Sequence, residues 1–340
     1  MPAAGAPGMI APVMTNRQFH IRAAGPQDGD TVARLCAALS AHEGAPPPAF
    51  TGDDFRRQAC GPEALFSGLI AEQDGRPVGY VLHKRDYDTD RLERGVHVLD
   101  LFVENTARGG GIGRALMASA AAAGKAYGAT LAYWGVLQGN PLARDFYRRI
   151  GGVENSAMSL WGVDDEGFDR LCRRPLPAGV AMREGTLADV PLLTRFLKNL
   201  FADMDEPPPP EIGPRLARDG FGPAPFFEIL IAERGGRALG YAMSWLTYET
   251  QEAESVIALS DLYVLPEGRG SGIGTALMGE VARRGRERGA GGLWWPVLKS
   301  NERARHYYAR FAIEDPDALY CTLDGEAFRR LAASAPAMHP

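Results

Sequence analysis

The chain has 340 residues, of which 45% are hydrophobic and 23% charged, and its formal net charge is −5. This length allows two ordinary globular domains, and the negative balance argues against a nucleic-acid surface while permitting cationic substrates. Without a long apolar run or a basic segment before an apolar core, we expect no membrane association and a cytoplasmic location.

Residues 1–18 are mostly Ala, Gly, Pro and Met, which predicts a disordered leader. The rest of the chain consists of two similar halves, because Arg22 and Arg183, like Asn140 and Asn301, are separated by the same offset of 161 positions. This internal duplication predicts a first domain over 19–171, a linker over 172–180 and a second domain over 181–335.

Each half begins with a short strand and a helix, and a strand–turn–strand hairpin follows. The hairpin turns are predicted at Asp74-Gly75 and Gly235-Gly236. Between helix and hairpin lie the proline-rich residues 45–48 and 207–210. They are predicted to be stiff connectors, with the rim of an acceptor site as the alternative.

Residues 100–117 and their copy, 261–278, organise the two halves. Each segment has the pattern of a strand, a turn, a glycine-rich loop and an amphipathic helix. The first turn of a helix has unpartnered N–H groups and the positive end of the macrodipole, and glycines expose them to a ligand. Arg108 and Arg269 add a positive charge to each loop. The pattern predicts a pyrophosphate site.

Two common phosphate loops do not fit. A Walker loop needs Gly-Lys-Ser/Thr at the helix start, where this chain has Gly113-Arg114-Ala115 and Gly274-Thr275-Ala276. A dinucleotide fingerprint needs an acidic residue about twenty positions on, and residues 127–133 and 289–293 contain no carboxylate. Magnesium-nucleotide and nicotinamide chemistry are therefore disfavoured.

The remaining pattern, Arg-x-x-Gly-x-Gly after a strand, resembles the acetyl-coenzyme A loop of the GCN5-related N-acetyltransferase (GNAT) family. Two copies in matching contexts make the signal specific, and the resemblance covers about residues 20–335. It implies an α/β fold with two tandem domains, each a mixed sheet flanked by helices. It also implies acetyl-coenzyme A as the cofactor and no metal.

Strands are predicted at residues 130–136 and 292–297. Because proline lacks a ladder donor, Pro296 indicates an edge or a place where strand pairing is broken. In the family, two parallel strands separate at such a place to admit the pantetheine arm, and Gly135 is the equivalent in the first half. Cys36, Cys60, Cys172 and Cys321 lack metal-site spacing and are expected to be reduced thiols.

The resemblance also implies the site residues. The loop, the strand before it and a helix-capping asparagine would bind the cofactor, through Leu101, Phe102, Val103, Arg108, Gly109, Gly110, Gly111, Ile112, Gly113, Arg114 and Asn140 in the first half, and through Leu262, Tyr263, Val264, Arg269, Gly270, Ser271, Gly272, Ile273, Gly274, Thr275 and Asn301 in the second. Tyr147 and Tyr308 would be the general acids. The alternative is that each tyrosine is only a core aromatic.

Residues 218–233, 241–249 and 261–264 look like the spermidine/spermine and thialysine N-acetyltransferase branch. The implied activity is direct acetyl transfer to a primary amine of a small, polyamine-like or amino-acid-like molecule. One alternative is that one half catalyses while the other binds coenzyme A or serves as a scaffold, and another is a non-catalytic acyl-coenzyme A sensor. We expect a monomer with pseudo-dimeric halves or a homodimer.

The general base is left open. Deprotonating an amine of pKa ~10.4 at neutral pH costs roughly 4–5 kcal/mol. The polyamine branch has a Glu before the strand Asp, where this chain has Leu99 and Ser260. Because neighbouring strand residues face opposite sides, Asp100 and Asp261 are expected not to replace it and to bond nearby backbone. The other carboxylates that we consider are Glu43, Asp86, Glu249 and Glu254.

Overall fold

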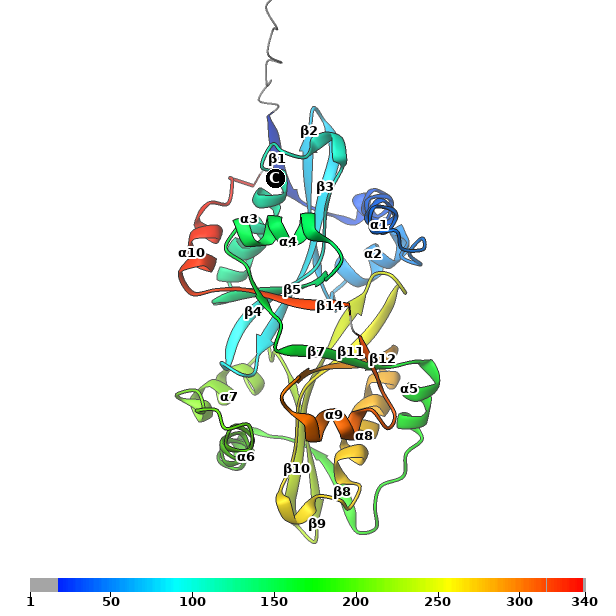
Figure 1. Ribbon diagram of the computed structural model, residues 1–340, viewed down its shortest axis with the longest axis vertical. Coiled ribbons are helices and arrows are strands. Elements are labelled where there is room, and N and C mark those ends of the chain that lie inside the picture. The colour runs from blue at the N-terminus through cyan, green and yellow to red at the C-terminus, as the bar shows by residue number, and fades with distance from the viewer. Residues whose placement is uncertain (1–17, 316, 339–340) are drawn as a thin grey trace, which may run out of the picture.

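The computed structural model describes residues 18–315 and 317–338, so the predicted leader, apart from Gln18, lies outside the described residues. The chain forms two seven-stranded mixed sheets with flanking helices, placed one after the other along the long axis (Figure 1). The predicted α/β class with two similar units is confirmed. None of the helices in the described ranges is long and apolar enough to cross a membrane.

The two halves have the same order of elements. The first half contains β1 (Phe19–Ala23), α1 (Gly29–Glu43), α2 (Gly52–Ala59), β2 (Ser67–Gln73), β3 (Arg76–Asp88), β4 (Glu93–Val103), α3 (Ile112–Lys125), β5 (Leu131–Leu137), α4 (Pro141–Arg149), β6 (Val153–Asn155), β7 (Met158–Val163) and α5 (Asp165–Cys172). The second half contains β8 (Val180–Glu184), α6 (Val190–Asp203), α7 (Ile212–Gly220), β9 (Glu228–Arg234), β10 (Arg237–Glu249), β11 (Glu254–Val264), α8 (Ile273–Glu287), β12 (Ala290–Leu298), α9 (Glu302–Tyr308), β13 (Ile313–Asp315), β14 (Ala318–Asp324) and α10 (Gly325–Ala333).

The predicted hairpin turns are confirmed, since Asp74, Gly75, Gly235 and Gly236 all have positive φ. Such a backbone matches the right-handed twist of the two strands that each turn connects.

The two sheets exchange a strand. Their orders are β1-β2-β3-β4-β5-β14-β6 and β13-β7-β12-β11-β10-β9-β8. β14 pairs with β5 from Ala318 opposite Leu137 onward, and β7 pairs with β12 over its whole length. The helices follow their strands, so α10 packs on α3 and α5 packs on α8 (Figure 1). The sheets therefore do not coincide with the ranges 19–171 and 181–335 that we expected as contiguous domains.

The hydrophobic cores depend on this exchange. Phe328 and Leu331 of α10, each 1% exposed, belong to the first half's core together with the alanine-rich face of α3. Phe168 and Leu171 of α5 lie in the second half's core. Burying a side chain of this size contributes about 1.5–3 kcal/mol, so each half draws stability from the other.

The long hairpins of the two halves also cross. Tyr248 at the end of β10 packs among buried side chains of α1 and α2, and Gln251 donates from its side-chain amide to the Pro46 carbonyl at 3.0 Å. In return, Tyr87 and Leu92 of the β3–β4 hairpin pack among side chains of α6 and α7. Each half thus inserts a hairpin next to the first helices of the other.

A cut in the linker tests the exchange. With a protease site introduced within residues 173–179, we expect the two fragments to stay together under native conditions, because each one completes the other's sheet. Size-exclusion chromatography should show one peak at the elution volume of the uncut chain, and a denaturing gel should show two bands. Two peaks in native buffer would contradict the exchange.

Candidate active site

The site begins where two parallel strands separate. β4 and β5 pair from Gly95 opposite Leu131 to Val98 opposite Trp134, and their pairing ends there. β11 and β12 pair only as far as Ala258 opposite Trp294. The next residue on β5 is Gly135, and Pro296 lies two residues after Trp294 on β12, so the breaks lie at or next to the predicted positions. Beyond the break, residues 101–103 of β4 pair with β3 and leave their other edge open.

A β-bulge lies at each break. Asp100 is opposite Leu82 and Val98 is opposite His83, so Leu99 has no partner, and Ser260 has the same place in β11. Leu99 packs against the cluster that contains Cys36, and Asp100 contacts the same cysteine. The two neighbours therefore face the same side. Our expectation that they face opposite sides is wrong, because a bulge interrupts the alternation on which it rested.

Both strand aspartates are buried and hydrogen-bonded to side chains. Asp100 accepts from the Tyr80 hydroxyl at 2.9 Å and from the Thr250 hydroxyl at 3.0 Å, and Asp261 accepts from the Tyr241 hydroxyl at 2.8 Å. Burial raises the pKa of both carboxyls, and these hydrogen bonds act in the opposite direction. The backbone bonds that we expected are replaced by side-chain bonds, one of which joins the two halves.

The first glycine-rich loop is open. Gly109 and Gly111 have φ of +85° and +86°, and a Cβ at 109, 110 or 111 would meet no atom within 4 Å. Arg108 is fixed at the loop entrance, where its Nε donates to the Val103 carbonyl at 2.8 Å. Gly111 caps α3 without a side-chain hydrogen bond, so the first-turn N–H groups remain for a ligand. This arrangement fits a pyrophosphate.

A cleft of about 570 Å³ opens on this loop. Its wall includes every predicted first-half site residue except Gly110, namely Leu101, Phe102, Val103, Arg108, Gly109, Gly111, Ile112, Gly113, Arg114, Asn140 and Tyr147. His42 and Glu43 from the end of α1 line the same cleft. The residues that the sequence predicted for the cofactor thus surround one cavity. The role of His42 was missed, since nothing near it in sequence connects it with the loop.

The asparagines cap helices as predicted. Asn140 Oδ1 accepts from the Ala143 N–H at 3.1 Å, and Asn301 Oδ1 accepts from the Ala304 N–H at 3.0 Å. α4 then carries Tyr147 into the cleft wall, where its ring lies 4.7 Å from the Trp134 ring and is 8% exposed. Burial raises the Tyr147 pKa above its usual value, which keeps the hydroxyl protonated. Tyr147 is therefore both a core aromatic and a cleft residue.

The arginine of the second loop is paired with a carboxylate. Its glycines Gly270 and Gly272 have the same positive φ, and Arg269 Nε donates to the Val264 carbonyl. However, Arg269 forms an ion pair with Asp203, whereas the guanidinium of Arg108 lies 3.1 Å from the ring of His42. Burial and the neighbouring Arg108 lower the His42 pKa, so that ring is neutral. The first loop keeps a positive charge that the second loop has neutralised.

The second loop is also more enclosed. The Thr275 hydroxyl is 2.7 Å from the Tyr307 hydroxyl, where the first half has Arg114 and Phe146. A Cβ on Gly272 would lie 3.5 Å from Pro177 of the linker. Tyr308 repeats the packing of Tyr147, with its ring 4.9 Å from Trp295. The backbone of the second loop thus has the same conformation as that of the first, but different side chains surround it.

The structure reduces four candidate bases to two. Asp86 is buried and contacts Lys84 Nζ at 3.1 Å and His97 Nδ1 at 3.3 Å. Although burial acts to raise its pKa, these neighbours lower it to about 2, so Asp86 is a poor proton acceptor. The neighbours of Glu254 are charged groups of α5 and α8, on the helix side of the second half.

Glu43 and Glu249 have the properties of a base. Burial, with a contribution from Asp100, raises the pKa of both, and Glu249 reaches about 7 with a further contribution from Glu252. Glu249 comes from the second half's hairpin, directly before the Thr250 that bonds Asp100. Its side chain is exposed to solvent and is not part of the cleft lining. Glu249 is thus a candidate base that would act from the second half, next to the cleft of the first.

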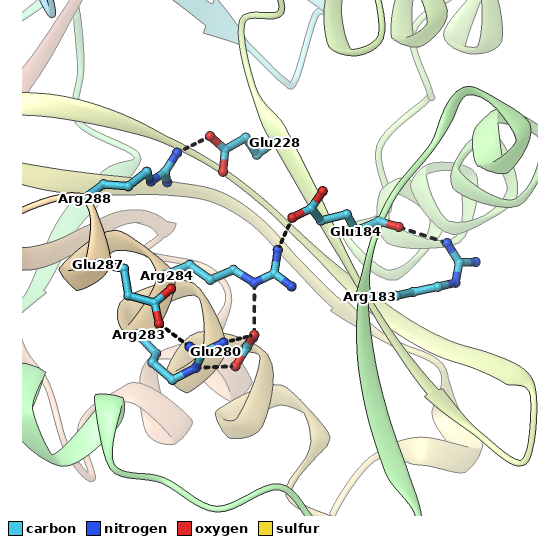
Figure 2. Close-up of polar contacts among 8 residues, drawn as sticks. All are labelled: Arg183, Glu184, Glu228, Glu280, Arg283, Arg284, Glu287 and Arg288. Atoms are coloured by element: carbon cyan, nitrogen blue, oxygen red, sulfur yellow. Dashed lines mark hydrogen bonds and ion pairs between the residues drawn. The ribbon is translucent and has the colours of Figure 1, made fainter. Parts of the chain in front are cut away.

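A separate cavity of about 630 Å³ lies between α8, β8 and β9. Arg283, Arg284 and Arg288 line it, and Figure 2 shows each of them already paired with glutamates. Arg284 bonds Glu184 at 2.7 Å and Glu280 at 2.9 Å. Because its positive charges are neutralised, this cavity is not a candidate for the cofactor phosphates.

Splayed parallel strands above an open glycine loop, with a capped helix beside them, define the class of acyl-coenzyme A-dependent transferases. The profile of the Acetyltransferase (GNAT) family matches residues 36–152 and again residues 195–312. The chain therefore belongs to this family and contains it twice. It is an N-acetyltransferase, and its cofactor is acetyl-coenzyme A.

Individual proteins support the assignment. The chain is 34% identical to thialysine N-epsilon-acetyltransferase of Bos taurus over 129 residues, which are 34% of this chain and 75% of that protein. Two solved structures are similar over 90% of the chain at 17% identity, and at this identity they show the fold alone. They are a tandem GNAT protein from the clavulanic acid biosynthesis pathway, with 98% of it covered and a TM-score of 0.51, and a GCN5-related N-acetyltransferase from Sphaerobacter thermophilus, with 95% covered and a TM-score of 0.52.

Replacing the loop glycines one at a time tests which half binds the cofactor. Gly111→Val should abolish the main acetyl-coenzyme A binding in calorimetry, because valine is strained at φ +86° and its branches would fill the open loop. Gly272→Val should leave that binding in place. Gly289→Val is the matched control, with φ +87° and open space around it at the end of α8. Intact binding in Gly111→Val would rule out the first loop.

Proposed function

We propose that the first half transfers acetyl from acetyl-coenzyme A directly to a primary amine of a small molecule. The observation that carries this proposal is the 570 Å³ cleft, in which the open glycine loop, Tyr147 and Glu43 lie together. The carboxylates around it suit an ammonium substrate. The similarity to thialysine N-epsilon-acetyltransferase supports an amino-acid-like or polyamine-like amine.

In this proposal the loop and the open strand edge bind the cofactor, which supplies a thioester when bound. Arg108, Arg114 and the first-turn N–H groups of α3 hold the pyrophosphate. The open backbone edge of residues 101–103 aligns the pantetheine arm and polarises the acetyl carbonyl. Asn140 fixes the start of α4 and so the place of Tyr147.

Tyr147 is the proposed general acid. Acetyl transfer releases a thiolate, whose conjugate thiol has a pKa near ~8.5. A hydroxyl that burial keeps protonated can donate a proton to this leaving group in the cleft. The second half repeats the residue as Tyr308 beside a loop whose arginine is neutralised. We therefore assign turnover to the site of Tyr147 and none to the site of Tyr308.

Glu249 is the proposed base. A carboxylate whose pKa is about 7 accepts a proton from an alkylammonium more readily than a carboxylate with an ordinary pKa. Its pKa is still roughly 3 units below that of the alkylammonium. Glu43 and Asp100 add negative charge that attracts the ammonium form. The second half would then contribute the base to the catalytic site of the first.

Tyr147→Phe tests the acid. We expect kcat to fall by about 10²-fold or more while acetyl-coenzyme A affinity stays the same, because the ring keeps its packing and only the proton donor is lost. The matched variant Tyr308→Phe should keep its kcat. Steady-state kinetics together with calorimetry separate the two effects, and an unchanged kcat in Tyr147→Phe would remove the assignment.

Glu249→Gln tests the base through the pH profile. Because the base accepts a proton only when ionised, kcat/KM of the wild type should decrease as pH falls through about 7. The variant should be slower and lose this limb of the profile. Glu254→Gln is the control on the same hairpin and should keep it. A limb that persists in Glu249→Gln would exclude Glu249 as the base.

A further inference from the structure

A smaller cavity of about 130 Å³ lies where the two halves meet, near the crossing of β7 and β14 at the waist of the molecule (Figure 1). We call it the seam cavity. It shares no lining residue with the first-half cleft. The residues that matter for its chemistry are Asp88, Asp90, Tyr133, Trp245, Trp294 and Tyr320. They come from five strands and the β3–β4 turn, so the cavity exists only in the assembled chain.

One wall of the seam cavity is acidic. Asp88 and Asp90 belong to the tip of the β3–β4 hairpin, and Asp261 and Glu206 of the second half add like charge. Arg91 faces them, but it lies 3.4 Å from Asp88 and gives its closer contact, at 2.7 Å, to Asp324. Although the Asp90 side chain is exposed, partial loss of its hydration and these like charges raise its pKa to about 7. The carboxylates of this wall therefore outnumber the positive charges next to them, so a bound cation would be stabilised here.

The other walls are aromatic. Tyr133 and Tyr320 lie with ring centroids 6.3 Å apart, and Trp245 and Trp294 complete the lining. Aromatic faces attract organic cations, by about 0.5–2 kcal/mol for each favourable contact. Lys84 is not part of this lining, but its Nζ, which contacts Asp86 at 3.1 Å, lies 5.9 Å from the centre of the Trp245 ring, so Tyr133, Tyr320 and Trp294 are the aromatic groups left for a ligand. Carboxylates combined with aromatic faces are the chemistry that recognises an alkylammonium group.

The two tryptophans of the lining have indole N–H groups without a partner in the described ranges. Trp245 is only 9% exposed, and its Nε1 has no hydrogen-bond partner among the described residues. The Nε1 of Trp294, in the same lining, also lacks one within the described part of the chain. The Nε1 atoms of Trp134 and Trp295, which do not line this cavity, also lack a partner among the described residues, so we base the proposal on the carboxylates and aromatic faces alone.

We propose that the seam cavity binds a small organic ammonium ion of the choline type. Asp88 and Asp90 would face the cationic end and the aromatic rings its alkyl groups. An engineered cavity of about 150 Å³ binds benzene, so a cavity of this size takes a molecule of about six or seven heavy atoms. Choline has no N–H group, so its binding can be measured apart from N-acetylation.

Titrating the full-length protein with choline tests the proposal. Because two of the five tryptophans line the cavity, their fluorescence should change saturably, and calorimetry should give the same Kd. The neutral isostere 3,3-dimethylbutan-1-ol should bind at least tenfold more weakly, since it has the shape of choline without its charge. No saturable binding of choline, or equal binding of the isostere, would overturn the proposal.

Variants locate the site. Asp88→Asn with Asp90→Asn should weaken choline binding about tenfold or more, and the asparagine oxygen at 88 can still accept the Arg91 N–H bond that shapes the turn. Asp74→Asn, at the tip of another hairpin, should stay within twofold of the wild type. If the double variant does not fold, Asp90→Asn at its exposed position replaces it. Unchanged affinity in the folded acidic variant would refute the site.

Discussion

The pairing of β14 with β5, and of β7 with β12, is the constraint on which the rest of the structure depends. Each sheet is completed by a strand of the other half, and the helix after that strand covers the core. The same crossing brings the long hairpins into contact with the opposite half, where Thr250 bonds Asp100 and Tyr87 enters the core beside α6. The bulge at Asp100, next to the candidate cleft, is thus held by contacts from both halves.

Within this symmetric frame, a few substitutions give the two halves different chemistry. In the open loop of the first half, Arg108 and Arg114 form no ion pair with a carboxylate of the described residues. In the second half, Arg269 is paired with Asp203, and the Thr275 hydroxyl lies next to the Tyr307 hydroxyl. Near the seam, Lys84 corresponds to Trp245 in the repeat. A duplicated backbone can therefore hold one site for an acyl carrier and another for an organic cation, since each depends on side chains that diverge independently.

The sequence predicted what local patterns determine. The glycine loops, the hairpin turns, the helix caps and the breaks at Gly135 and Pro296 all follow from residues within a short window. The strand exchange was not predictable in this way, because β7 and β14 are copies of each other and fit either sheet with the same pattern of buried residues. The bulge at Leu99 could not be predicted, because no glycine in the sequence marks its position. The place of Glu249 beside Asp100 depends on contacts between distant parts of the chain.

The exchange also has a consequence for synthesis on the ribosome. One edge of β5 pairs with β4, but its other edge pairs with β14, where Leu131 lies opposite Asp324, so the first sheet keeps an unpaired edge while the second half is made. At about 5–20 residues per second this interval lasts on the order of 10–40 s. An edge strand exposed for so long is open to pairing with another nascent chain on the same messenger. Two such chains could exchange strands with each other, and the linker counters this by keeping the proper partner at a high local concentration.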